Sequence, residues 1–174
     1  MKKNLMLFGA IALVFAALGF YMSSRQPSLA QAPETAAVAK LLSQTMADAS
    51  GKPQALSQWK GKPLVVNFWA TWCAPCVEEM PELSALQPEL APAKIQILGI
   101  GIDSAANIAE FATKYKITYP LYVGGMEATE LSRQLGNQAG GLPFTVVIGS
   151  DGRVRKTYLG RLKMQELKND LKAL

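Results

Sequence analysis

The chain has two cysteines, Cys73 and Cys76, and two residues separate them. Such a pair can be a structural disulfide, half of a metal site or a redox pair. A disulfide across so short a loop would restrict the unfolded chain little, and no further metal ligands accompany the pair. The pair follows an apolar run and opens a predicted helix, where unpaired N–H groups and the helix dipole favour a thiolate. The pattern therefore favours a redox pair.

Other catalytic chemistries lack the residues that they need. The 174 residues include no histidine, which excludes Ser-His-Asp and Cys-His pairs, histidine–metal sites and imidazole acid–base chemistry. Two cysteines are too few for a four-thiolate zinc site, and the chain has no phosphate-binding loop. We therefore expect neither a cofactor nor a metal.

The net charge of +5 arises mainly at the C-terminal end. Residues 152–174 contain 7 basic and 2 acidic residues, whereas residues 33–151 contain 8 basic and 11 acidic residues. A basic end without a pattern of interleaved aromatic residues is more typical of a solvated face than of a nucleic-acid groove. The sequence therefore predicts no nucleic-acid partner.

The N-terminal segment predicts a membrane anchor. Leu5–Met22 is an uninterrupted run of 18 apolar or small residues behind two lysines. A helix of that length is about 27 Å long, close to the hydrocarbon thickness of a bilayer. We predict a signal anchor over residues 1–22, with its lysines in the cytoplasm, and a flexible tether over residues 23–39. Cleavage after Ala30-Gln31-Ala32 is the alternative.

The remaining residues, 40–174, predict one α/β domain. A small hairpin is expected around Ser50-Gly51-Lys52-Pro53. Beyond it, strands first alternate with helices, and then a hairpin and a helix end the chain, an order that predicts a sandwich around a mixed sheet. The expected strands cover residues 64–69, 95–102, 121–123, 144–148 and 154–159, and the expected helices cover 74–90, the segment after Ser104, 127–135 and the C-terminal stretch.

Residues 65–76 resemble the active site of the thioredoxin fold, with the sequence Val-Val-Asn-Phe-Trp-Ala-Thr-Trp-Cys-Ala-Pro-Cys. More narrowly, residues 40–174 resemble the membrane-anchored, extracytoplasmic TlpA/ResA-type thiol–disulfide oxidoreductases. Residues 141–145 resemble the cis-proline loop of that family, which faces the two cysteines. The resemblance implies a three-layer sandwich with an extra N-terminal hairpin and a helix–strand insertion before Pro143.

The resemblance also implies roles for individual residues. Cys73 is nearer the helix start and is expected to attack the substrate, and Cys76 is expected to resolve the mixed disulfide. In ResA-like proteins a glutamate at the place of Glu79 lies by the cysteines, which implies a part in proton handling. An ordinary surface acid is the alternative for Glu79, since Glu78 and Glu82 are equally acidic. The expected substrate contacts are Trp72, Pro75, Leu142 and Pro143.

The residues between the cysteines, Ala74 and Pro75, predict a reductase. Oxidising members of the fold use a histidine there, so this chain should have a potential nearer thioredoxin, about −270 mV, than DsbA, about −120 mV. The resemblance implies protein disulfides as substrates, as in cytochrome c or copper-site maturation, and electrons from a transmembrane thiol carrier of the DsbD/CcdA kind. We expect a monomer, anchored in the inner membrane with its catalytic domain in the periplasm.

Two other functions stay open at this point. A peroxiredoxin-like thiol peroxidase would share the fold, but it needs a threonine three residues before its reactive cysteine, where this chain has Ala70. A non-catalytic module that binds an apoprotein or a metallochaperone would need no reaction at the cysteines. A Cys76→Ser variant distinguishes that module from an enzyme, because only an enzyme traps its substrate at Cys73.

Overall fold

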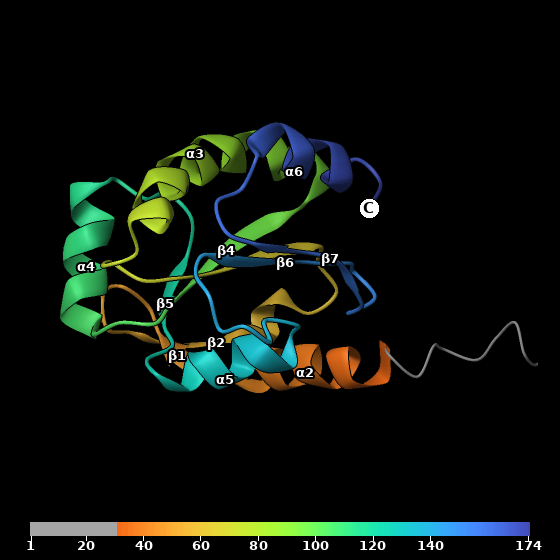
Figure 1. Ribbon diagram of the computed structural model, residues 1–174, viewed down its shortest axis with the longest axis horizontal. Coiled ribbons are helices and arrows are strands. Elements are labelled where there is room, and N and C mark those ends of the chain that lie inside the picture. Colours follow the sequence, from red (N-terminus) through yellow and green to blue (C-terminus); the bar gives the residue numbers. More distant parts are fainter. Residues whose placement is uncertain (1–30) are drawn as a thin grey trace, which may run out of the picture. The chain divides into compact units, whose positions relative to one another are not determined.

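A five-stranded sheet forms the centre of the computed structural model, which describes residues 31–174 (Figure 1). The predicted anchor over residues 1–22 and the first part of the predicted tether, residues 23–30, lie outside the described residues. Within residues 31–174, no helix has both the length and the apolar character needed to cross a bilayer.

The sheet has the strand order β5-β4-β3-β6-β7. β3 (Leu64–Trp69) is central and pairs in parallel with β4 (Gln96–Gly101), which pairs in parallel with β5 (Leu121–Val123). On its other side β3 pairs with β6 (Phe144–Ile148), and β6 pairs with β7 (Val154–Leu159), both antiparallel. The register therefore brings the ends of β3, β4 and β5 to the same edge as the start of β6.

Helices cover both faces of this sheet (Figure 1). α3 (Ala74–Leu90), α4 (Ala105–Lys114) and α6 (Met164–Leu171) contribute to one core, and α2 (Gln31–Ser43) and α5 (Glu127–Gln134) to the other. Alternate residues of β3 enter opposite cores, Val65 and Trp69 the first, Val66 and Phe68 the second. Every residue of β3 is consequently buried, which explains its continuous apolar sequence. This arrangement confirms the predicted three-layer α/β sandwich.

The short elements also follow local sequence signals. β1 (Thr45–Ala47) and β2 (Pro53–Ala55) form the predicted hairpin, whose turn has Gly51 at φ +84°. Two single 3-10 turns, η1 (Leu56–Trp59) and η2 (Ala91–Ala93), precede β3 and β4. The Ser104 side chain accepts a hydrogen bond from the Asn107 N–H, as expected for the residue that caps α4.

The predicted tether is wrong from residue 31 onward, because α2 begins at Gln31 and continues to Ser43. Four of its residues, Ala37, Val38, Leu41 and Leu42, are buried in the second core. Residues 33–174 form one compact unit, so the domain begins several residues before residue 40. The helix exists because burying these side chains against the sheet compensates for a sequence with little helical periodicity of its own.

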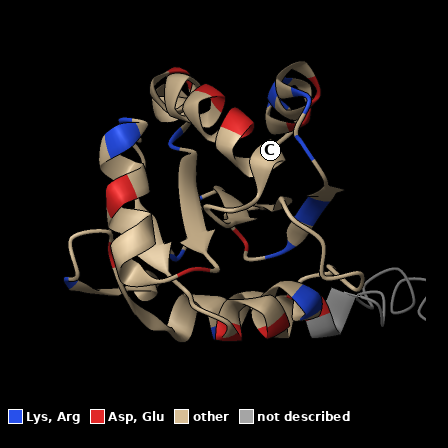
Figure 2. Ribbon diagram, turned by 60° about the vertical axis from the view of Figure 1, so that its left-hand side comes forward, with Lys and Arg blue, Asp and Glu red and all other residues tan. Residues whose placement is uncertain are grey.

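The basic C-terminal segment is largely neutralised within the domain. Figure 2 shows acidic residues along α3 and basic residues on β7 and in the chain that follows it. Arg155 pairs with Asp151 at 2.8 Å, and Lys168 pairs with Glu89 of α3 at 2.8 Å. Interspersed charges of both signs are typical of a solvated surface, as the sequence indicated.

Candidate active site

Cys73 and Cys76 are joined by a disulfide at the start of α3. Cys73 is the N-cap residue, and its carbonyl oxygen accepts hydrogen bonds from the N–H groups of Cys76 and Val77. Pro75 lies in the first helical turn, where a missing N–H costs nothing. The side chain of Cys73 is 6% exposed and that of Cys76 is fully buried. Of the two residues, Cys73 is therefore the more exposed.

A carboxylate that the sequence analysis did not identify fixes the loop before Cys73. Asp103, two residues after the end of β4, accepts hydrogen bonds from the Thr71 N–H at 3.2 Å and from the Thr71 hydroxyl. It also accepts from the Asn107 side chain and the Ser104 N–H, both at 2.7 Å. Partial burial raises the pKa of Asp103, but these hydrogen bonds outweigh burial and hold the pKa below its usual value. An ionised Asp103 therefore holds the loop that follows β3 against the start of α4.

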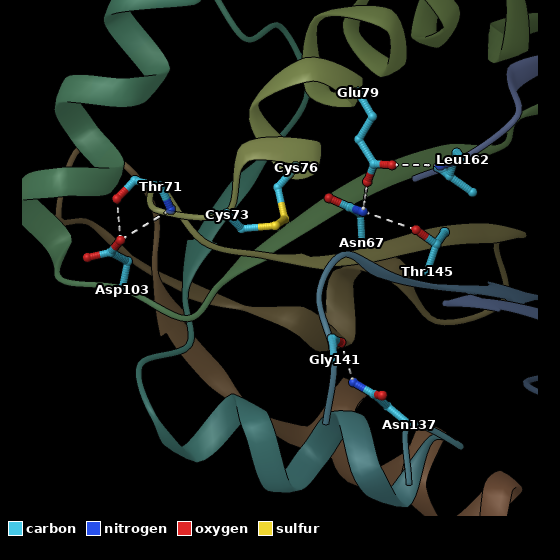
Figure 3. The surroundings of a disulfide bond; sticks show 10 residues. All are labelled: Asn67, Thr71, Cys73, Cys76, Glu79, Asp103, Asn137, Gly141, Thr145 and Leu162. Carbon is cyan, nitrogen blue, oxygen red and sulfur yellow. Dashed lines mark hydrogen bonds between the residues drawn. A yellow bond between two sulfur atoms is a disulfide. The ribbon is translucent and has the colours of Figure 1, made fainter. Parts of the chain in front are cut away.

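Glu79, one turn after Cys76, is completely buried. Its Oε1 accepts a hydrogen bond from Asn67 Nδ2 at 2.8 Å, and its Oε2 accepts one from the Leu162 N–H at 2.9 Å (Figure 3). Burial raises the pKa of Glu79 to about 7, although both hydrogen bonds oppose this effect. The carboxyl can therefore gain or lose a proton near neutral pH. The alternative of an ordinary surface acid is wrong for Glu79 and describes its neighbours Glu78 and Glu82.

The side chain of Asn67 connects its own strand, β3, to α3 and β6. Its Nδ2 donates to Glu79 on α3 and, at 3.0 Å, to Thr145 Oγ1 on β6. Its Oδ1 has no hydrogen-bond partner among residues 31–174. An amide with a free oxygen can turn over, so Asn67 can serve either protonation state of Glu79.

The predicted substrate contacts lie on two segments at the same sheet edge. Trp72 is 71% exposed, Pro75 is exposed, and both flank Cys73. Leu142 is half-buried, and the Leu142–Pro143 peptide bond is cis, as predicted. Pro143 itself is buried, which leaves its backbone and its neighbours as the accessible parts of this loop.

Two hydrogen bonds hold the loop before β6 in place. The Asn137 side chain donates to the carbonyl oxygen of Gly141 at 2.9 Å, and the Gly160 N–H donates to that of Pro143 at 2.8 Å. Figure 3 shows Gly141 on the opposite side of the disulfide from α3.

In residues 31–174, no cluster of three or more Cys, Asp or Glu side chains could hold a metal ion.

Comparisons with known proteins agree with this arrangement. The model of the redoxin family matches residues 26–173. The chain is 29% identical over 130 residues to the thiol-disulfide oxidoreductase ResA of Geobacillus thermodenitrificans, covering 74% of this chain and 72% of that protein. It is also 29% identical to ResA of Bacillus cereus over 177 residues, which cover 100% and 99% of the two chains.

A solved structure shows the same fold. The thiol:disulfide interchange protein of the thioredoxin family from Chlorobium tepidum is 27% identical, with a TM-score of 0.64 over 75% of this chain and 91% of that one. The chain therefore belongs to the redoxin family, as a thioredoxin-fold, ResA-like thiol–disulfide oxidoreductase.

Proposed function

We propose that this thiol–disulfide oxidoreductase reduces disulfides of other proteins, with Cys73 as the attacking and Cys76 as the resolving residue. In the reduced enzyme the Cys73 thiolate attacks one substrate sulfur, forms a mixed disulfide and releases the other substrate sulfur as a thiolate. The Cys76 thiolate then attacks Cys73 and releases the second substrate thiolate. The substrate gains two electrons, and the enzyme is left with the Cys73–Cys76 disulfide.

The observation that carries this assignment is the unequal placement of the two sulfurs. Cys73 caps α3, beside the exposed Trp72, whereas Cys76 lies inside the helix and is fully buried. With 6% of its surface exposed against none for Cys76, Cys73 is the residue that a substrate sulfur is proposed to reach. Cys76 must lose a proton in a buried place, and Glu79, three residues further along α3, is the carboxyl suited to accept it because burial raises its pKa to about 7.

The direction of electron flow follows from the residues between the cysteines. Ala74 and Pro75 offer no charge that would further stabilise a Cys73 thiolate. A less stabilised dithiol is a better electron donor, so the potential should lie on the reducing side of protein disulfide isomerase, about −180 mV.

The proposed compartment is the periplasm or its equivalent. The apolar run behind two lysines supports a single-pass anchor over residues 1–22, with the domain outside the cytoplasm. A reductase there needs electrons from across the membrane, which a thiol carrier of the DsbD/CcdA kind would deliver. Its substrates would be disulfides such as those of apocytochrome c or of a copper-site protein, and it would act as a monomer. An alkaline-phosphatase fusion after residue 40 should be active, and an inactive fusion would contradict this location.

A peroxidase is less well supported by the site. The position three residues before Cys73 is held by the buried Ala70, which has no hydroxyl group. The next residue, Thr71, uses its hydroxyl to donate to Asp103. Neither residue offers a free hydroxyl for a peroxide oxygen, so a peroxide assay should show little turnover.

Trapping of substrates tests the proposed function. Full-length Cys76→Ser should accumulate mixed disulfides with other proteins, and mass spectrometry would identify them. The Cys73→Ser variant is the matched control and should trap far less, because its remaining thiol is buried. Equilibration of the wild type with glutathione buffers measures the potential. Equal trapping by both variants would contradict the assigned order of attack, and a potential near −120 mV would contradict the reductase.

A further inference from the structure

Three of the four residues between β7 and α6, Gly160, Arg161 and Leu162, form a stretch that contacts both the cis-proline loop and Glu79. The Gly160 N–H donates to the carbonyl oxygen of Pro143 at 2.8 Å, and the Leu162 N–H donates to Glu79 at 2.9 Å. Gly160 has φ +89°, a conformation that residues with a side chain rarely adopt. We call this stretch the 160–162 segment. It links the cis-proline loop to the buried carboxyl.

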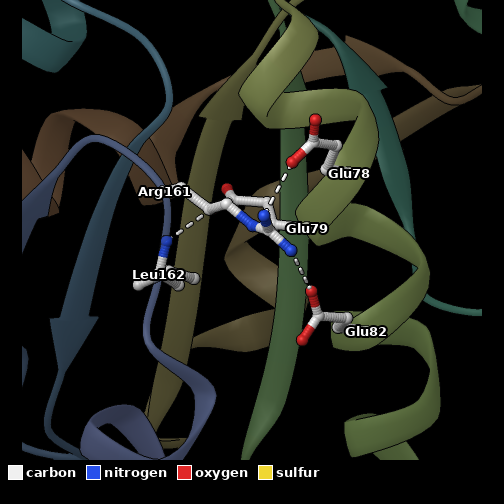
Figure 4. Close-up of polar contacts among 5 residues, drawn as sticks. All are labelled: Glu78, Glu79, Glu82, Arg161 and Leu162. Carbon is white, nitrogen blue, oxygen red and sulfur yellow. Dashed lines mark hydrogen bonds and ion pairs between the residues drawn. The ribbon is translucent and has the colours of Figure 1, made fainter.

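Arg161 fastens this segment to α3. Its two terminal nitrogens pair with Glu78 at 2.7 Å and with Glu82 at 2.8 Å (Figure 4). These two carboxylates precede and follow Glu79 on the helix, and Figure 4 shows the guanidinium between them. The planar guanidinium group suits such a double contact because it holds two terminal nitrogens in a fixed fork, whereas a lysine has a single charged nitrogen.

We propose that Arg161 is a positioning residue for Glu79, which keeps the Leu162 N–H on the buried carboxyl and offsets the negative charge around it. For electron transfer, this role rests on the proposed function, in which Glu79 accepts the proton of Cys76. Surface ion pairs of this exposure stabilise a fold little, since Arg161 and its two partners are about half exposed. The effect of Arg161 should therefore be local to Glu79 and visible in its titration.

The groups that face Glu79 determine the sign of the effect. The titratable or charged groups that interact with Glu79 are Glu82 of α3, Arg161 of the 160–162 segment and the buried Tyr119 before β5. The charge of Arg161 lowers the pKa of Glu79, and that of Glu82 raises it. Loss of Arg161 removes a nearby cation and leaves its two acidic partners without this ion pair. The pKa of Glu79 should then rise, and less carboxylate should be present at pH 7.

The first experiment follows Glu79 directly and needs no catalytic turnover. The carboxyl titration of Glu79 is measured by NMR in the oxidised protein for wild type, Arg161→Met, Arg161→Lys and Lys168→Met. Lys168→Met is the matched control, since Lys168 also pairs with a glutamate of α3 at 2.8 Å but not beside Glu79. Arg161→Met should raise the midpoint by about 0.5 to 1 unit, Arg161→Lys by less, and the control not at all. An unchanged midpoint in Arg161→Met overturns the proposal.

The second experiment tests the consequence for electron transfer. Stopped-flow measurements of the reduced variants with a model disulfide separate formation of the mixed disulfide from its resolution. If the midpoint rises from about 7 by one unit, the ionised fraction at pH 7 falls about fivefold, and resolution should slow by up to that factor. Formation should stay within about twofold of the wild type, because Cys73 does not depend on Glu79. Equal slowing of both steps contradicts a role through Glu79.

A double variant completes the test. In a Glu79→Gln background, adding Arg161→Met should change resolution no further, because the residue through which it acts is already neutral. A further fall in the resolution rate of the double variant would show that Arg161 does not act through Glu79, and this result would overturn the proposal. If the NMR midpoint shifts but neither the wild type nor any variant forms mixed disulfides, the proposed function is wrong. The positioning of Glu79 by Arg161 then still stands.

Discussion

Glu79→Gln should stabilise the oxidised protein at neutral and alkaline pH, although it alters a completely buried residue with two hydrogen bonds. Burial raises the pKa of Glu79 from 4.5 to about 7. Well below pH 4.5 the carboxyl is protonated in the folded and the unfolded chain, so ionisation costs nothing. As pH rises, the unfolded chain ionises first, and folding loses stability until the folded carboxyl also ionises above about pH 7. The complete loss corresponds to about 3 kcal/mol.

The glutamine variant avoids this loss because it has no charge to bury. Its amide oxygen can accept from the Leu162 N–H, and its nitrogen can donate to Asn67 once that amide turns its free Oδ1 inward. Allowing about 1 kcal/mol for an imperfect hydrogen bond, the variant should be more stable than the wild type by about 2 kcal/mol at about pH 8. At about pH 4.5, where little stability is lost to ionisation, the same imperfect hydrogen bond should leave the variant slightly less stable than the wild type.

Denaturant unfolding of the oxidised proteins at about pH 4.5, 6 and 8 provides the measurement. The quantity compared is the difference in unfolding free energy between variant and wild type, because the contributions of the other titrating groups then cancel. Glu89→Gln is the control, since it removes an exposed carboxylate of α3 that pairs with Lys168 and not beside Glu79, and it should change stability by no more than about 0.5 kcal/mol at any pH. If the difference for Glu79→Gln does not grow between the lowest and the highest pH, the buried carboxyl does not titrate as argued.

Two further changes test the packing and the surface of the site. Gly99→Ala would place its Cβ 2.4 Å from Leu121 Cδ2 and 3.2 Å from Trp69 Nε1, so unfolding free energy should fall by about 1 to 3 kcal/mol in denaturant unfolding, and an unchanged value would mean that this core yields easily. Trp72→Ala removes a side chain that is 71% exposed, so it should leave stability within about 0.5 kcal/mol while slowing mixed-disulfide formation in stopped-flow assays, and equal rates would exclude a substrate contact.

Local signals in the sequence are enough to predict the elements that carry the cysteines. The bounds of β3 and α3 agree with prediction because a nearly continuous apolar run ends at Trp69 and a proline stands in the first helical turn. The start of the domain was not predictable in the same way. α2 contains alanine, glutamine and proline, and its buried side chains become an apolar face only when the sheet and α5 lie against them.

The polar contacts of the site depend on contacts distant in sequence. Helical spacing places Glu79 near Cys76, but it cannot distinguish a buried Glu79 from its more exposed neighbour Glu78. What distinguishes them is the Leu162 N–H, 83 residues away, which the 160–162 segment brings over the helix. The contact of Asp103 with Thr71 spans 32 residues and likewise has no local signal. The sequence shows only that Asp103 follows a predicted strand and precedes Ser104, and this does not indicate a contact with Thr71.

The site also explains why an amide at position 67 is compatible with a carboxyl at position 79. An ionised aspartate in place of Asn67 would lie within hydrogen-bond distance of Glu79 in the same core, and two buried like charges strongly raise one pKa. Asn67 instead donates to Glu79 when it is ionised and can accept from it, through the free Oδ1, when it is protonated. The buried carboxyl can then change its protonation near neutral pH without losing its hydrogen-bond partners, which the proposed transfer of the Cys76 proton to Glu79 requires.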